Sequence, residues 1–246
     1  MRALLAGMGA AAALAHPGEV EVLASFAKAL YVATPGGVAA FVAPGVEPGP
    51  LHVVLDAAPT PEAARLELSG VPVWRGALPD RRSLAEALPG VLAALAALAA
   101  RNLVPAERAA SAVRALGRGD LADAADRLGG AGPGLTPAGD DALGGILFAH
   151  RALGGDACGD RLAAIAGRVR TTTISGAFLS WAARGQALGP VHDLLAAAVA
   201  GDVAAARSAA RALARVGHSS GADFAWGFCQ AAHSKLPALP NLPGRY

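Results

Sequence analysis

The chain has 246 residues, of which 54% are hydrophobic, so it can bury a substantial core in one large domain or two small ones. Charged residues make up 16% and the formal net charge is +2, which argues against a disordered chain. There is no Lys/Arg run and no row of interleaved aromatics, so nucleic acid is not expected as a partner.

The first 15 residues, MRALLAGMGAAAALA, have two interpretations. A positive residue, an apolar run and the small residues around Ala13-Leu14-Ala15 outline a secretory signal peptide. Because Gly7 and Gly9 interrupt the run, we expect instead the first buried element of the domain. The segment also contains GMGAAA, a weak echo of a dinucleotide-binding loop that lacks the acidic residue expected about 20 residues further on.

Short β-like runs follow between Glu19 and Trp74, separated by Gly and Pro: ALYVATP, GVAAFVAP, PLHVVLDA and VPVWRG. From Ser83 onward, Ala/Leu runs with helical spacing predict helices at 84–101, 105–117, 119–129, 140–154, 158–169, 174–185, 191–200, 202–216 and 220–233. The run LPGVLAALAALAARN is too short to span a membrane and begins with Pro89 and Gly90, so it predicts a buried helix and no membrane partner.

These patterns predict the α+β class. A smaller N-terminal β-containing part, 1–82, precedes a larger, mostly α-helical part, 83–233, and a Pro-rich tail, 234–246, that is either loose or clamped onto the helices. Cys158 and Cys229 stand alone without a CxxC pattern, so they indicate neither a zinc site nor a disulfide framework. A reducing compartment, the cytoplasm, fits this use of cysteine.

Polar residues gather before three of the predicted helices. The segments are GPGLTPAGDD at 132–141, RTTTISGAFLSWAARG at 170–185 and GHSSGADFAWGF at 217–228. A helix N-terminus has free N–H groups and the positive end of the helix dipole, and therefore binds phosphate or carboxylate readily.

Helix capping is the simpler interpretation of each segment taken alone. Thr136 before Pro137 resembles an N-cap with proline at the first helical position, and Ser220 with Asp223 fits a capping box. One residue of the threonine run, Thr171 to Thr173, would suffice as a cap. Each segment nevertheless has two or three polar groups, with glycines that let a ligand approach the backbone.

Two adjacent carboxylates, Asp140 and Asp141, stand out in a chain with few charges. Neighbouring residues on a helix point about 100° apart, so the two cannot share one simple structural role. The helix dipole favours both at a helix start. The alternative is that one faces a cleft as a base or magnesium ligand while the other holds a neighbouring loop.

The three segments resemble the family that includes the AllH subunit of oxamate carbamoyltransferase, formerly a domain of unknown function. That family has GxGLTPSGDDxLxG, TTxIS and GHSSGxD stretches, which here stand in the same order as GPGLTPAGDDALGG, TTTISGAFL and GHSSGADFAWG. The resemblance is strong over roughly 130–230 and loose before it. Two positions depart from the pattern: Ala138 replaces the usual Ser, and Ala222 precedes Asp223 where Trp is frequent.

The resemblance implies a cytoplasmic, oligomeric enzyme subunit of purine-nitrogen catabolism, in allantoin degradation, that moves a carbamoyl group between phosphate and the nitrogen of oxamate. Small anions such as carbamoyl phosphate and oxamate would need N–H donors, hydroxyls and cationic help. Catalytic candidates are Asp140, Asp141 and His218, and substrate-binding candidates are Gly132, Gly134, Thr136, Arg170, Thr171, Thr172, Ser175, Ser219, Ser220 and Asp223. No cofactor is firmly indicated; a divalent metal such as magnesium would fall to Asp140 or Asp141.

Several alternatives remain open at this point. His218 could be an acid or base near neutral pH or a structural histidine, and Arg170 could serve a surface ion pair. The chain could also be a non-catalytic structural subunit whose three segments form an interface with other subunits. A nucleotide-dependent ligase or kinase is disfavoured, because G-x-x-x-x-G-K-[ST] is absent. A site predicts that the three segments converge on a concave pocket, whereas an interface predicts a flat, apolar surface with the same residues spread across it.

Overall fold

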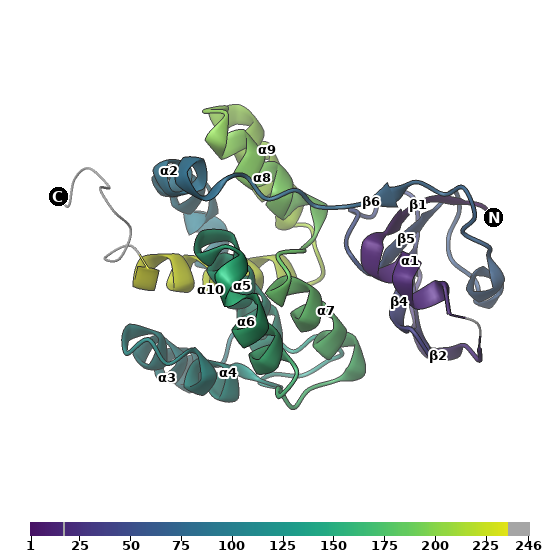
Figure 1. Ribbon diagram of the computed structural model, residues 1–246, viewed down its shortest axis with the longest axis horizontal. Helices are drawn as coiled ribbons and strands as arrows, with labels where there is room; N and C mark the ends of the chain where they lie inside the picture. The colour runs from purple at the N-terminus through teal and green to yellow at the C-terminus, as the bar shows by residue number, and fades with distance from the viewer. Residues whose placement is uncertain (17, 236–246) are drawn as a thin grey trace. The chain divides into compact units, whose positions relative to one another are not determined.

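The computed structural model describes residues 1–16 and 18–235, so the predicted Pro-rich tail lies, from residue 236 onward, outside the described residues. The chain divides into two compact units. Unit 1 is Met1–Gly76 with Gln186–Gly189, and unit 2 is Ala77–Gly185 with the chain from Pro190 onward. Sheet in the first unit and helices in the second confirm the α+β class (Figure 1).

Unit 1 is built on a mixed sheet. Within the described residues this sheet has six strands in the order β2-β3-β4-β5-β1-β6. The strands are β1 (Ala3–Gly7), β2 (Glu21–Ser25), β3 (Ala29–Thr34), β4 (Gly37–Val42), β5 (His52–Leu55) and β6 (Val73–Trp74). The β4/β5 and β1/β6 pairs are parallel and the others antiparallel. A short 3-10 helix, η1 (Pro61–Arg65), precedes β6.

The first residues form β1 and then helix α1 (Met8–Leu14), which packs on the sheet. Ala6, Ala10 and Ala13 are buried there with Phe41, so the expectation of a buried first element is confirmed. The strand-like runs from 29 onward are also confirmed as β3 to β6, whereas β1, α1 and β2 were not predicted as separate elements.

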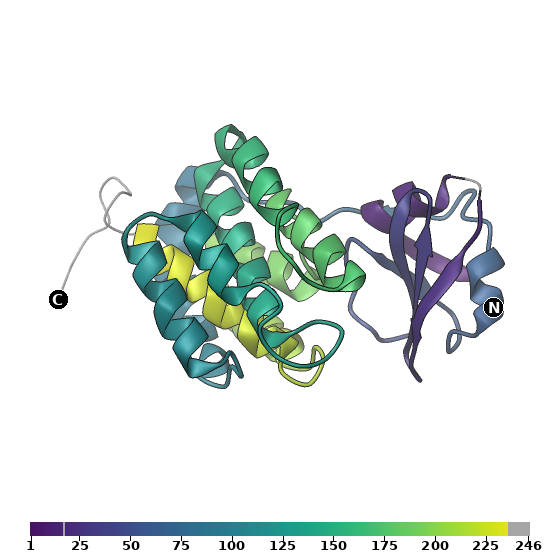
Figure 2. The same cartoon turned by 90° about the horizontal axis from the view of Figure 1, so that it is seen from below.

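The helices of unit 2 lie close to their predicted positions in the sequence. Figure 2 shows these helices packed together. They are α2 (Arg81–Ala99), α3 (Ala106–Gly117), α4 (Leu121–Leu128), α5 (Ala138–Gly154), α6 (Gly159–Ala166), α7 (Thr173–Ala183), α8 (Gly189–Val199), α9 (Val203–Leu213) and α10 (Ser220–Lys235), with a 3-10 turn, η2 (Asp156–Cys158). High alanine content gives these helices narrow faces that pack closely.

Helix α2 corrects one expectation, that its apolar run is too short to span a membrane, because the helix has 19 residues. By length and composition it is long and apolar enough to cross a membrane. Its buried residues are Leu84, Leu88, Val91, Leu95, Leu98 and Ala99, and α2 packs against α9, α10 and α5. One face of α2 is thus buried in unit 2.

Helices α5 and α10 form the most extensive helix pair of the unit, and glycines bring their backbones together. A Cβ added at Gly227 would lie 1.8 Å from the backbone oxygen of Ala142, and one at Gly145 would lie 2.1 Å from that of Phe224. No side chain fits at these positions without separating the helices. The crossing therefore fixes the start of α10 against the start of α5.

Gly227→Ala is expected to lower the free energy of unfolding by about 3 kcal/mol, because the added methyl group overlaps backbone. The matched control is Gly90→Ala in α2, where an added Cβ meets nothing within 4 Å. That control should raise the free energy of unfolding by about 0.5–1 kcal/mol through helix propensity. Urea denaturation of both variants measures the difference, and equal effects would contradict the close crossing.

Candidate functional site

Asp140 joins two of the three polar segments. Its side chain is 1% exposed, in the first turn of α5. Oδ1 accepts a hydrogen bond from the backbone N–H of Gly130 at 2.7 Å, and Oδ2 accepts one from the Thr171 hydroxyl. Both carboxylate oxygens are thus occupied, and Asp140 holds the loop before α5 against the segment before α7.

The hydroxyl of Thr172 adds a second connection between these segments. It donates to the backbone oxygen of Leu135 at 2.5 Å and accepts from the N–H of Ser175 at 3.0 Å. Thr172 is therefore the N-cap of α7, as the sequence allowed for one residue of the threonine run. Ser175 is buried behind it, while Thr173 is exposed.

Two of the predicted caps are wrong. Helix α5 begins at Ala138 with Pro137 as its N-cap residue, so Thr136 lies one position too early to cap it. Helix α10 begins at Ser220, which is therefore a helical residue. Local sequence could not reveal the start of α5, because the backbone N–H of Gly139 donates a hydrogen bond to the backbone oxygen of Ala131, eight residues earlier in the chain.

Asp141, the last residue of the first segment, contacts the third segment. Burial raises the pKa of its carboxyl, and the charges of Asp223 and Asp140 also raise it, whereas hydrogen bonding by the hydroxyls of Ser220 and Thr136 lowers it. The net pKa is about 8. Oδ2 is buried and has no hydrogen-bond partner among the described residues. Asp141 is thus a protonated acid at neutral pH, in contact with the hydroxyl of Thr136 in its own segment and with that of Ser220 in the third segment.

Asp223 is a second buried acid, 0% exposed, in the first turn of α10. Oδ1 accepts from the backbone N–H of Leu103 at 2.6 Å, whereas Oδ2 is buried without a partner among the described residues. Burial raises the pKa of this carboxyl, while the Leu103 N–H and the Ser219 hydroxyl lower it. Asn102 shapes the loop that presents Leu103, because its side chain bonds Ala99 and Val104.

The three polar segments therefore meet around the N-termini of α5, α7 and α10. Among the remaining candidates, Gly132 and Gly134 lie in an exposed loop at φ of +121° and +94°, conformations that favour glycine. Arg170 is exposed, and its guanidinium has no ion pair or hydrogen bond with a described residue. Arg170 and the three helix N-termini can attract an anion. Asp141 and Asp223 can each donate a proton to a bound molecule or accept one from it.

His218 is exposed, and its ring has no hydrogen bond to a described residue, so its catalytic role stays a prediction. Sequence reasoning missed the backbone donors Gly130 and Leu103, because a main-chain N–H leaves no signal in residue type. Among the described residues no three His, Cys, Asp or Glu side chains come together as a metal-binding group.

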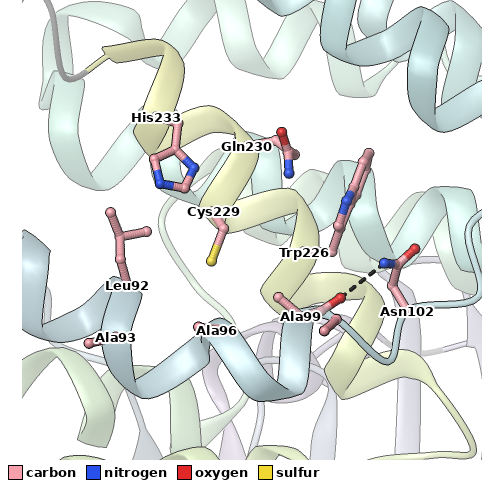
Figure 3. Close-up of a pocket in the computed structure, with 10 residues that line it drawn as sticks. Leu92, Ala93, Ala96, Ala99, Asn102, Trp226, Cys229, Gln230 and His233 are labelled. Atoms are coloured by element: carbon pink, nitrogen blue, oxygen red, sulfur yellow. Dashed lines mark hydrogen bonds between the residues drawn. The ribbon is translucent and has the colours of Figure 1, made fainter.

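A hollow of about 580 Å³ lies elsewhere in unit 2, between α2 and α10 (Figure 3). It is lined by Leu92, Ala93, Ala96, Ala99, Ala100, Asn102, Trp226, Cys229, Gln230 and His233. Burial raises the pKa of the Cys229 thiol to about 11, so this thiol is unreactive at neutral pH. None of the predicted site residues lines this hollow, which distinguishes it from the cluster of acids.

The fold and the cluster define an α+β chain with a helical unit in which three helix N-termini surround buried acids. The family model described as oxamate carbamoyltransferase subunit AllH matches residues 128–232, which include all three segments. The resemblance found from the motifs is confirmed over this range, and the word "subunit" in the description implies a multi-subunit complex. No curated protein and no solved structure matches the chain.

The raised pKa of Asp141 predicts how stability changes with pH. Since the folded-state pKa is about 8 and the ordinary value is 3.8, the folded state retains a proton that the unfolded state loses between these values. The contribution is fully present below about pH 4 and is lost as pH rises through about 8, with a loss on the order of a few kcal/mol. Asp141→Asn should remove this part of the decline.

The measurement is urea denaturation from pH 5 to pH 9 for wild type and Asp141→Asn. Asp120→Asn is the control, because Asp120 is the exposed N-cap of α4 and Asn caps a helix equally well. This control should keep the wild-type profile. An Asp141→Asn profile that parallels wild type throughout would show that the carboxyl is not held as an acid.

Proposed function

We propose that the chain is a subunit of an oxamate carbamoyltransferase-like enzyme, in which the N-termini of α5, α7 and α10 bind small anionic substrates. The observation that supports this most is the convergence of three distant segments on Asp140 and Asp141, within the range that the family model matches. Carbamoyl phosphate and oxamate are anions of the size that a helix N-terminus and a few hydroxyls recognise. Arg170 supplies a nearby cation.

Asp141 is the proposed acid–base group of the reaction. In transfer to phosphate, a phosphate oxygen attacks the carbamoyl carbon, the bond from that carbon to the oxamate nitrogen breaks, and the departing nitrogen takes the proton of Asp141. The reverse reaction returns the proton to Asp141 as the oxamate nitrogen attacks carbamoyl phosphate and phosphate leaves with the electron pair. A pKa of about 8 suits both directions near neutral pH.

Asp140 is a positioning residue in this scheme, because both of its oxygens hold loop atoms. The rival function, a non-catalytic subunit with the segments at an interface, is less well supported. Asp140 and Asp223 are buried within the unit, whereas an interface would need such residues exposed. We further propose a cytoplasmic enzyme of purine-nitrogen catabolism; Cys158 and Cys229 are both free thiols, which suits a reducing compartment.

Arg170 alone does not balance the negative charge of two bound anions. We therefore expect partner subunits to supply the remaining positive charge. We expect the chain alone to be inactive, and the chain co-expressed with the products of neighbouring genes to form carbamoyl phosphate from oxalurate and phosphate. Full turnover by the isolated chain would contradict the shared site. Turnover by neither sample would contradict the proposed substrates.

Within the active complex, Asp141→Asn should lower kcat by about 100-fold or more, the usual contribution of a general acid. The assay follows carbamoyl phosphate formation, and circular dichroism verifies that the variant is folded. Asp120→Asn is again the control and should retain wild-type kcat. If the complex keeps full kcat with Asp141→Asn, Asp141 is not the proton donor.

A further inference from the structure

The structure leaves two carboxylate oxygens without partners in one place. Asp141 Oδ2 and Asp223 Oδ2 are both buried and accept no hydrogen bond from a described residue. A buried acceptor without a donor costs free energy, so such atoms are rare in folded proteins. The two acids lie close enough for the charge of Asp223 to raise the pKa of Asp141.

Other contacts fix the positions of both acids. Asp223 is anchored through its other oxygen to the Leu103 N–H at 2.6 Å. Asp141 is held in the first turn of α5 by the glycine crossing with α10. Asp140, in the same turn, has hydrogen bonds to both oxygens. Of these three acids, only Asp141 and Asp223 therefore have an oxygen without a partner among the described residues.

We propose that these two oxygens accept hydrogen bonds from the nitrogen of a substrate amide or carbamoyl group, and thereby select anions that carry an N–H donor. This inference rests on the proposed function. A carboxylate or phosphate group offers only acceptors, so it has no hydrogen to donate to either oxygen. A primary amide has two N–H donors on one nitrogen, which matches two acceptors.

The two ends of such a ligand then have separate recognition groups. The anionic end meets the helix N-termini and Arg170. The amide end meets Asp141 and Asp223. Acidic residues would ordinarily weaken the binding of an anion. Here Asp141 and Asp223 determine specificity, because they bind the part of the ligand that is not anionic.

The test compares oxamate, pyruvate and oxalate, which share a carboxylate beside a carbonyl carbon and differ in an NH₂, CH₃ or O⁻ substituent. Calorimetry measures Kd for each with the full chain, alone and co-purified with the products of neighbouring genes. Oxamate should bind at least 10-fold more tightly than either analogue, because a buried acceptor left unpaired penalises a ligand without the donor.

Asp223→Asn and Asp141→Asn should reduce that preference to within about 3-fold, because the side-chain amide that replaces Oδ2 is itself a donor. Two variants are used so that a folding defect in one leaves the other informative, and Asp120→Asn should keep the full preference. Loss of the preference in either folded variant supports the assignment. Retention in both variants overturns it.

The outcomes also separate this inference from the proposed function. Equal binding of all three anions to wild type overturns the selection of N–H donors but leaves an anion site in place. Binding of none of them by either preparation overturns both. Preference for oxalate would show that the buried oxygens are bridged by a cation, and it also overturns the assignment.

Discussion

The close crossing of α5 and α10 is the constraint on which the rest of the candidate site depends. Gly145 and Gly227 let the two backbones touch, and this contact places Asp141 beside Ser220 and near Asp223. Because the contact is between main-chain atoms, it leaves little freedom to slide or rotate either helix. The carboxylates are consequently positioned by the core of unit 2 rather than by a mobile loop.

The buried oxygens of Asp141 and Asp223 that lack hydrogen-bond partners among the described residues lower the stability of the folded state. Each of the two acids has one such oxygen, at the starts of α5 and α10. Asp140 shows the contrasting solution, in which burial is offset by hydrogen bonds from Gly130 and Thr171. Departures from good local design that have no structural compensation are expected at functional sites, and Asp141 and Asp223 fit that pattern.

Much of the helical part could be predicted because alanine and leucine spacing sets helix positions locally. The polar segments were also recognisable, since each interrupts an apolar sequence. The start of α5 was not, because Thr136 and Pro137 form a good local N-cap signal that the loop contacts of Ala131 override. Similarly, β1 and α1 lie in one apolar stretch that both Gly7 and Gly9 interrupt, so composition does not show which glycine ends the strand.

The partners of the acids lay beyond sequence reasoning altogether. Leu103 binds Asp223 through its backbone, so its apolar side chain gives no hint of the contact. The different roles of Asp140 and Asp141 likewise follow from which side of α5 faces the threonine segment and which faces α10. Motif resemblance could identify the three segments together, but only the fold distinguishes the satisfied acid from the unsatisfied ones.

The protonation state of Asp141 tests this account most directly. Infrared difference spectra between wild type and Asp141→Asn, recorded from pH 5 to pH 10, isolate the carbonyl stretch of the protonated carboxyl. The account predicts that this band is present at pH 7 and titrates away near pH 8. A band that is already absent at pH 6 would show that the carboxyl is ionised and solvated, and would contradict a buried, unpaired acid at the meeting point of the three helices.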